Sequence, residues 1–209
     1  ATSYLLVDAT TLKVLAEKSS RERKAPASLT KIMTSYVIEE ELQAGRLSAE
    51  EKVEVSVNAW RMGGSRMFIR EGTQVQVSEL LKGIVIQSGN DASVALAEHI
   101  AGSEESFAQM MNQQAIAIGM QDSNFRNSTG LPDEDHYSTA WDLALLTQAL
   151  IENHPEHYAL YAQKSYTYND ITQPNRNRLL WRDRSVDGVK TGYTQSAGYC
   201  LVASAERAG

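Results

Sequence analysis

Apolar and polar positions alternate near both ends of the 209-residue chain, and helical spacing fills the middle. The alternation predicts short strands over residues 3–8, 12–17, 52–57, 73–77, 189–193 and 198–205. The first two flank Ala9-Thr10-Thr11, which predicts a hairpin. Strand character returns only after about Asp187, so no strand is expected between residue 77 and that point.

Apolar residues recur every three or four positions between these strands, which predicts helices. The expected helices cover residues 28–42, 78–85, 91–101 and 104–118, and run from Ser138 or Thr139 to 151. Ser78 is expected to cap the second of them, and Gly45, Gly102 and Gly119 are typical helix stops. Strands at both ends with helices between them predict an α/β fold, in which one antiparallel sheet is built from both termini and a helical lobe is inserted.

A single domain of two lobes is therefore expected over residues 1–209. The sheet lobe would comprise about 1–26 and 183–209, and the helical lobe about 27–182. A cleft between two lobes is the default position for a binding site.

Composition narrows the classes of function. The net charge of −6 argues against nucleic acid as a partner, because phosphate binding needs a basic face. No apolar run approaches the ~18 residues of a membrane span. A single cysteine, Cys200, rules out an internal disulfide, and its place in an expected strand favours a buried structural thiol.

Three short motifs carry the candidate chemistry, and they occur in a fixed order. They are Ser28-Leu29-Thr30-Lys31, Ser88-Gly89-Asn90 and Lys190-Thr191-Gly192. Each is weak evidence alone. Together they predict a serine acyl-transfer site in which a lysine is the base.

The first motif supplies a nucleophile and its base. Pro26 suits a first helical turn, so Ser28 is expected near a helix N-terminus. Residues three apart share a helical face, which places the amine of Lys31 beside the hydroxyl of Ser28. The amine can accept a proton only when neutral, and the ordinary lysine pKa is ~10.4. Burial and a second cation must therefore lower the pKa of Lys31.

The other two motifs supply the remaining groups. Ser88 can pass a proton to a leaving amine, and the amide of Asn90 can bind a substrate carbonyl or Lys31. The glycine between them is expected to permit a tight turn, and Asp91 to start the next helix. Lys190 would be the second cation and would attract a carboxylate, which Thr191 could bind. Gly192 would let an extended peptide approach the strand closely.

Other sequence motifs give weaker evidence for a function. Gly-x-Ser-x-Gly and His-Glu-x-x-His are absent from the sequence. Residues 154–157, His-Pro-Glu-His, are expected to be a loop and not a metal pair, and residues 133–136 an acidic loop without calcium. No metal and no cofactor are expected. The glycine loop over residues 62–67 is interpreted as a connector, with the alternative that it lines the cleft.

At these residues the chain resembles the penicillin-binding proteins and serine β-lactamases, and among them the low-molecular-mass D-alanyl-D-alanine carboxypeptidases of the penicillin-binding protein 5 type. The resemblance covers nearly the whole chain. Besides the three motifs it includes residues 4–8, 25–34, 129–132, 136–144 and 197–199.

The resemblance implies a two-lobed α/β fold and removal of the terminal D-alanine from peptidoglycan pentapeptides. The enzyme would act in the periplasm or on the outer face of the cytoplasmic membrane, in cell-wall synthesis and cell shape. Matched by motif, Ser28, Lys31 and Ser88 would be catalytic. Asn90, Lys190, Thr191 and Gly192 would bind substrate, and the backbone N–H groups of Ser28 and Tyr193 would form the oxyanion hole. The partners would be the peptidoglycan stem peptide and β-lactam antibiotics, which would acylate the serine.

Two departures from the family pattern matter. Tyr193 stands where relatives often have histidine after Lys-Thr-Gly. The family also continues past the last strand with another strand, whose arginine helps to hold the substrate carboxylate, and Arg207 does not match that position. We therefore expect a chain shortened at its C-terminus, with an exposed sheet edge. Membrane association is expected only through a segment absent from this chain.

Several alternatives stay open from the sequence. A serine β-lactamase would share all three motifs, although no Glu-x-x-Leu-Asn motif is present to hold a deacylating water. An endopeptidase that cuts D-Ala cross-links would differ only in how its cleft receives the donor strand. A cell-wall peptide-binding protein without activity is a further possibility, if the shortened chain cannot assemble its cleft.

Overall fold

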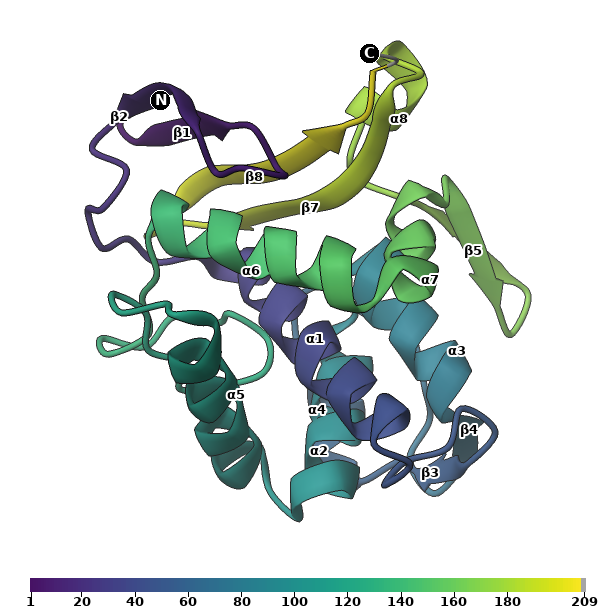
Figure 1. Ribbon diagram of the computed structural model, residues 1–209. Coiled ribbons are helices and arrows are strands. Elements are labelled where there is room, and N and C mark those ends of the chain that lie inside the picture. The colour runs from purple at the N-terminus through teal and green to yellow at the C-terminus, as the bar shows by residue number, and fades with distance from the viewer. Residues whose placement is uncertain (208–209) are drawn as a thin grey trace.

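The computed structural model describes residues 1–207 as an α/β molecule with antiparallel strands (Figure 1). The strands are β1 (Tyr4–Val7), β2 (Val14–Lys18), β3 (Lys52–Glu54), β4 (Gln74–Gln76), β5 (Ser165–Tyr168), β6 (Ile171–Pro174), β7 (Val186–Thr194) and β8 (Gly198–Ala205). The helices are α1 (Thr30–Gln43), α2 (Val57–Arg61), α3 (Val77–Lys82), α4 (Asn90–Ala101), α5 (Glu104–Ile118), α6 (Ala140–Asn153), α7 (Pro155–Tyr158) and α8 (Leu179–Arg182). Two short 3₁₀ helices, η1 (Ala27–Leu29) and η3 (Ala159–Ala162), and one π-helix, η2 (Gly83–Gln87), complete the elements.

Helix α1 lies at the centre of the molecule, because its first nine residues, Thr30–Ile38, are all buried. Helix α4 is buried over its first eight residues, Asn90–Ala97. A helix that is covered on every side needs internal partners for its polar groups. Ser35 Oγ, for example, pairs with Tyr161 Oη at 2.5 Å, while the apolar side chains of both helices join one hydrophobic core.

Helix ends follow the local rules for capping. Thr139 Oγ1 accepts a hydrogen bond from Asp142 N and begins α6, as the sequence predicts, and Ser103 caps α5 in the same way. Gly102 and Gly119 end α4 and α5 with φ of 78° and 93°, a left-handed conformation that glycine adopts without steric cost.

The β7–β8 hairpin lies along one side of the helical body (Figure 1). It pairs in antiparallel register from Val186 with Ala205 to Thr194 with Gly198. Strand β7 packs against η1 and η3, and β8 also contacts η1. The strand that carries Lys190 is thereby brought against the helix start that carries Ser28.

The prediction of one sheet built from strands at both termini is wrong. Over residues 1–207, β1 pairs only with β2 and β7 only with β8, so the terminal strands form two separate hairpins. Within each hairpin the two strands hydrogen-bond to each other. Over residues 1–207, no backbone hydrogen-bond ladder joins the β1–β2 hairpin to the β7–β8 hairpin. The prediction of antiparallel strands in an α/β fold is confirmed, and the boundaries of the two lobes stay a prediction.

Four local predictions also need correction. Gln76, not Ser78, precedes the first turn of α3. Residues 56 and 57 do not extend β3, because Ser56 Oγ caps α2. Strands β5 and β6 lie where none was expected, joined by Asn169 and Asp170, whose φ angles of 49° and 64° suit a hairpin turn. Residues 155–158 form the short helix α7 instead of a loop.

Candidate active site

Ser28 lies in η1, immediately before α1, as the sequence predicts. One helical turn later, Lys31 is 1% exposed. Its Nζ donates hydrogen bonds to Asn90 Oδ1 and Thr129 O, both at 2.7 Å, and lies 3.3 Å from Ser28 Oγ. The structure thus brings together the first two motifs and adds a carbonyl oxygen that sequence reasoning did not assign.

This geometry dictates how a neutral Lys31 would be oriented. A neutral amine has two N–H donors and one lone pair. The oxygens of Asn90 and Thr129 can only accept, so they use both donors. The lone pair then points at Ser28 Oγ, which can donate its proton. Loss of one proton from Lys31 therefore turns it into a base aimed at the serine hydroxyl.

Burial and neighbouring charges favour that neutral form. The pKa of Lys31 lies well below the ordinary lysine value, chiefly because burial penalises the charged amine. The positive charges of Lys190 and Arg176 lower it further, while Asp91 and Glu104 act in the opposite direction. The second cation predicted from the Lys-Thr-Gly motif is therefore present and acts in the predicted sense.

Lys190 is the second buried lysine of the site. Burial and the charge of Arg176 lower the pKa of Lys190 to about 7. Arg176 is exposed and belongs to none of the three motifs. Its effect on the two lysines could not be predicted from the sequence, because only the fold brings its charge near them. The charges of Lys190 and Arg176 add to the effect of burial, and all three lower the pKa of Lys31.

The third motif touches the first through Gly192. A Cβ atom at Gly192 would lie 3.0 Å from Ser28 N and 3.2 Å from Ala27 Cβ. Strand β7 can therefore approach η1 closely only because this residue lacks a side chain. The approach that the structure shows is that of the Ser28 backbone, and the approach of an extended peptide to Gly192 stays a prediction. Tyr193 follows directly and is exposed, with its ring 4.6 Å from that of Tyr199.

Ser88 occupies a strained position between η2 and α4. Its φ is 65°, a left-handed conformation for a residue with a side chain. Its buried Oγ has no hydrogen-bond partner among residues 1–207. Strain and an unpaired buried hydroxyl both carry a cost in stability, and they cluster at functional positions. Gly89 has an ordinary φ of −62°, so the turn needs a glycine there for space and not for backbone conformation.

The loop that supplies Thr129 O is fixed from two sides. Glu104 Oε1 accepts from Ser128 N and Oγ at 2.9 and 2.7 Å. Gly130 has a φ of 83°, and a Cβ atom there would lie 1.8 Å from Ala27 O. The residue must therefore be glycine for this loop to pack on η1. The turn itself is predictable, because Thr-Gly-Leu-Pro at 129–132 is a turn signal, but the contact of Thr129 O with Lys31 is not.

His136 supports the start of α1. Its Nδ1 accepts from Arg126 N at 3.2 Å, so the ring proton lies on Nε2, which donates to Thr30 Oγ1 at 2.8 Å. Burial lowers the pKa of His136 to about 4. The residue predicted to end an acidic loop is thus a buried structural group.

The remaining candidates lie outside the site. Cys200 is partly buried in β8, and burial raises the pKa of its thiol. His154 and His157 are buried and lie 2.8 Å from Glu40 and Glu39 of α1. Over residues 1–207, no cluster of three or more histidine, cysteine, aspartate or glutamate side chains is arranged for a metal ion.

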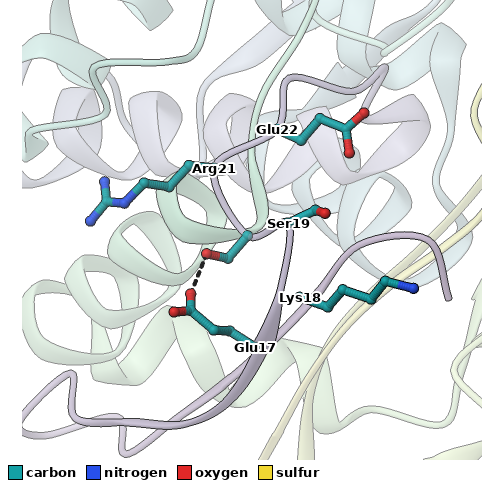
Figure 2. Close-up of a pocket in the computed structure, with 6 residues that line it drawn as sticks. Glu17, Lys18, Ser19, Arg21 and Glu22 are labelled. Carbon is teal, nitrogen blue, oxygen red and sulfur yellow. Dashed lines mark hydrogen bonds between the residues drawn. The ribbon is translucent and has the colours of Figure 1, made fainter.

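An open surface hollow of about 660 Å³ lies along residues 17–22 (Figure 2). Within it, Ser20 Oγ donates to Glu17 Oε2 at 2.5 Å. None of the residues of the three motifs lines this hollow. In the described part of the chain, no helix has both the length and the hydropathy to cross a membrane.

The site places a serine at a helix start, in contact with a buried lysine and near a second lysine on the adjoining strand. This arrangement is typical of serine acyl-transfer enzymes that use a lysine base. Residues 1–209 match peptidase family S11, described as D-alanyl-D-alanine carboxypeptidase. The chain belongs to this family, as its sequence predicts.

Relatives and solved structures agree with this assignment. The D-alanyl-D-alanine carboxypeptidase DacC of Escherichia coli K12 is 49% identical over 98% of this chain and 53% of its own length. Penicillin-binding protein 5 from Haemophilus influenzae superimposes with a TM-score of 0.97 at 43% identity, over 99% of this chain and 61% of that one. The ampicillin-bound form of penicillin-binding protein D2 from Listeria monocytogenes gives 0.90 at 29%, over 100% and 85%. The chain spans about half the length of the curated relatives it matches.

Proposed function

We propose that this chain carries the catalytic site of a serine D-Ala-D-Ala carboxypeptidase, which removes the terminal D-alanine from the pentapeptide stem of peptidoglycan. The observation that carries this proposal is the contact between Lys31 Nζ and Ser28 Oγ, made by a lysine that is buried and beside a second cation. Membership of the carboxypeptidase family supports the choice of substrate.

Acylation would begin at Ser28. Neutral Lys31 takes the hydroxyl proton, and Ser28 Oγ attacks the carbonyl carbon of the D-Ala-D-Ala bond. The backbone N–H groups of Ser28 and Tyr193 form the oxyanion hole, and each such donor is worth about 10²–10³ in rate. The approach of Gly192 to Ser28 N supports this pairing, because it brings the two backbones together.

The substrate would lie along β7. Lys190 and Thr191 hold its terminal carboxylate, Gly192 leaves room for its backbone, and Asn90 contacts its amide groups. Ser88 relays the proton from Lys31 to the nitrogen of the departing D-alanine. The unpaired Oγ of Ser88 supports that role, because a substrate nitrogen would give it a partner. Water then hydrolyses the acyl-enzyme and releases the tetrapeptide stem.

The same site would bind β-lactam antibiotics as covalent inhibitors, as the ampicillin-bound relative suggests. Its place of action would be outside the cytoplasm, at the cell wall. The catalytic domain would comprise a sheet lobe and a helical lobe on either side of the cleft, and no cofactor would take part.

Release of D-alanine tests the proposal. The protein is incubated with a peptide that ends in D-Ala-D-Ala, with a peptide that ends in D-Ala-L-Ala as substrate control and Ser28→Ala as enzyme control. We expect D-alanine from the first peptide only, and none with Ser28→Ala. Binding of the peptide without release would instead favour a non-catalytic binding protein.

A further inference from the structure

Asp91 carries a buried carboxylate that the acylation step does not use. It is 1% exposed, and all four of its hydrogen bonds come from backbone N–H groups. Oδ1 accepts from Met67 at 3.0 Å and from Ala92 at 2.9 Å, and Oδ2 accepts from Phe68 at 2.9 Å and Ile69 at 3.2 Å. A buried carboxylate needs such partners, and charged hydrogen bonds of this kind are strong.

Three of these donors are consecutive residues of one loop. Phe68, in the middle, has a φ of 67°, a left-handed conformation that is costly for an aromatic residue. Successive N–H groups around a left-handed residue form a concave nest that binds anions. In this molecule the nest holds the carboxylate of Asp91. The loop therefore keeps a strained shape because the carboxylate fills it.

Gly89 makes room for this arrangement. A Cβ atom at Gly89 would lie 2.9 Å from Asp91 Oδ1 and 3.2 Å from Met67 N. Since the φ of Gly89 is ordinary, space and not conformation requires glycine here. The middle residue of the second motif thus serves the contact between the carboxylate and the loop.

The other end of the same loop holds Asn90. Ser65 O accepts from Asn90 N at 2.7 Å, and Gly63 O accepts from Asn90 Nδ2 at 2.8 Å. These bonds fix the orientation of the amide, whose Oδ1 faces Lys31 Nζ. Residues 63–69 are therefore attached to α4 twice, through Asn90 at one end and Asp91 at the other. The loop is therefore attached to Asn90 of the second motif and is not a plain connector, and its lining of the cleft stays a prediction.

We propose that Asp91 is a positioning residue for acylation: its carboxylate holds the loop 63–69, and the loop orients the Asn90 amide against Lys31. The inference rests on the proposed function. The charge of Asp91 also acts on Lys31 directly. Lys190 and Arg176 lower the pKa of Lys31, whereas Asp91 and Glu104 raise it. Removal of the Asp91 charge therefore lowers the pKa of Lys31 further.

Asp91→Asn tests the proposal, with Asp142→Asn as the matched control. Asp142 is also buried, at 3% exposure, and accepts from Asp122 N at 2.9 Å and Ser123 Oγ at 2.7 Å. The rate of acylation by benzylpenicillin is followed by intact mass from pH 5 to 10, beside thermal melting and hydrogen exchange of residues 63–69.

We expect both variants to melt at lower temperature. Only Asp91→Asn should lose exchange protection over residues 63–69 and acylate about 10- to 100-fold more slowly, the scale of small misplacements in active sites. The acid limb of its pH profile should move to lower pH. Acylation at the wild-type rate with an unmoved acid limb, despite lost protection, would overturn the proposal.

Gly89→Ala covers the case in which Asp91→Asn does not fold. It crowds the nest but keeps the charge, so acylation should slow while the acid limb stays in place, and unchanged acylation would overturn the proposal. If the wild-type chain is not acylated at all, the proposed function fails. The exchange data then test the loop contact alone: selective loss of protection over residues 63–69 in Asp91→Asn supports the attachment of the loop to Asp91, and unchanged protection overturns it.

Discussion

Lys31 Nζ lies 3.3 Å from Ser28 Oγ and makes its two shorter hydrogen bonds, both 2.7 Å, to oxygens that can only accept. One lost proton leaves the lysine lone pair with a single direction, toward the serine. Burial and the positive charge of Lys190 lower the pKa of Lys31 well below the ordinary lysine value, so Lys31 loses this proton at a lower pH. The base is therefore oriented before a substrate arrives.

Lys31→Arg should abolish most acylation. Arginine keeps the positive charge but does not deprotonate in proteins, so no base faces Ser28. General-base catalysis contributes about 10²–10⁴ in rate, and we expect a loss of that size at every pH. Stopped-flow measurement of benzylpenicillin acylation checks it, with Lys164→Arg at an exposed position as control. A variant within about threefold of wild type would remove Lys31 from the mechanism.

The pH profile of acylation should be bell-shaped. The rate rises as Lys31 loses its proton, and it falls above the pKa of Lys190, about 7, because neutral Lys190 no longer attracts the carboxylate. Arg176 lowers the pKa of both lysines. Arg176→Gln should therefore move both limbs to higher pH.

Arg178→Gln is the matched control for that experiment. Arg178 is also exposed, but it is not among the charges that shift the pKa of Lys31 or Lys190. Its profile should coincide with that of the wild type. Identical profiles for both variants would show that Arg176 does not set the ionisation of the site.

Gly192→Ala should slow acylation without unfolding the chain. Its Cβ would sit 3.0 Å from Ser28 N, so β7 must move away from η1 and the backbone donors near Ser28 separate. Loss of one oxyanion donor costs about 10²–10³ in rate. Acylation at the wild-type rate would argue against the close approach.

His136 should make stability depend on pH. Its pKa is about 4 in the folded protein, against 6.5 for an ordinary histidine, so the unfolded chain binds more protons between these values. The stabilisation is complete above pH 6.5 and is lost as the pH falls toward 4, and it amounts to about 3 kcal/mol.

His136→Asn keeps an acceptor for Arg126 N and removes the titration. Urea unfolding at pH 7 and pH 4.5 should show a smaller difference in unfolding free energy for this variant than for the wild type. The same difference in both proteins would assign the pH dependence to other groups.

Local signals predicted most of the helices. Thr139 and Ser103 are caps that act within one turn, and glycines after α4 and α5 need only their own backbone freedom. The β5–β6 hairpin was missed although Asn169-Asp170 is a turn signal between alternating residues. The separation of the terminal strands into two hairpins was not predictable, because pairing between distant strands depends on the whole fold.

The site divides in the same way. Ser28 and Lys31 could be paired from their spacing alone, since three residues span one helical turn. Asn90 and Lys190 could be proposed from their motifs. Thr129, Arg176 and the contact of Asp91 with the loop 63–69 could not, because each joins segments that are far apart in the sequence or acts through backbone atoms that every residue shares.

Intact-mass analysis with benzylpenicillin tests whether Ser28 is the nucleophile of a carboxypeptidase site. Wild-type protein and Ser28→Ala are mixed with the drug and followed over time. We expect a long-lived adduct of one penicillin on the wild type, located on the peptide that contains Ser28, and none on the variant. An equal adduct on Ser28→Ala would contradict the assignment of the nucleophile. Rapid hydrolysis of the drug without a lasting adduct would contradict the carboxypeptidase and favour a β-lactamase.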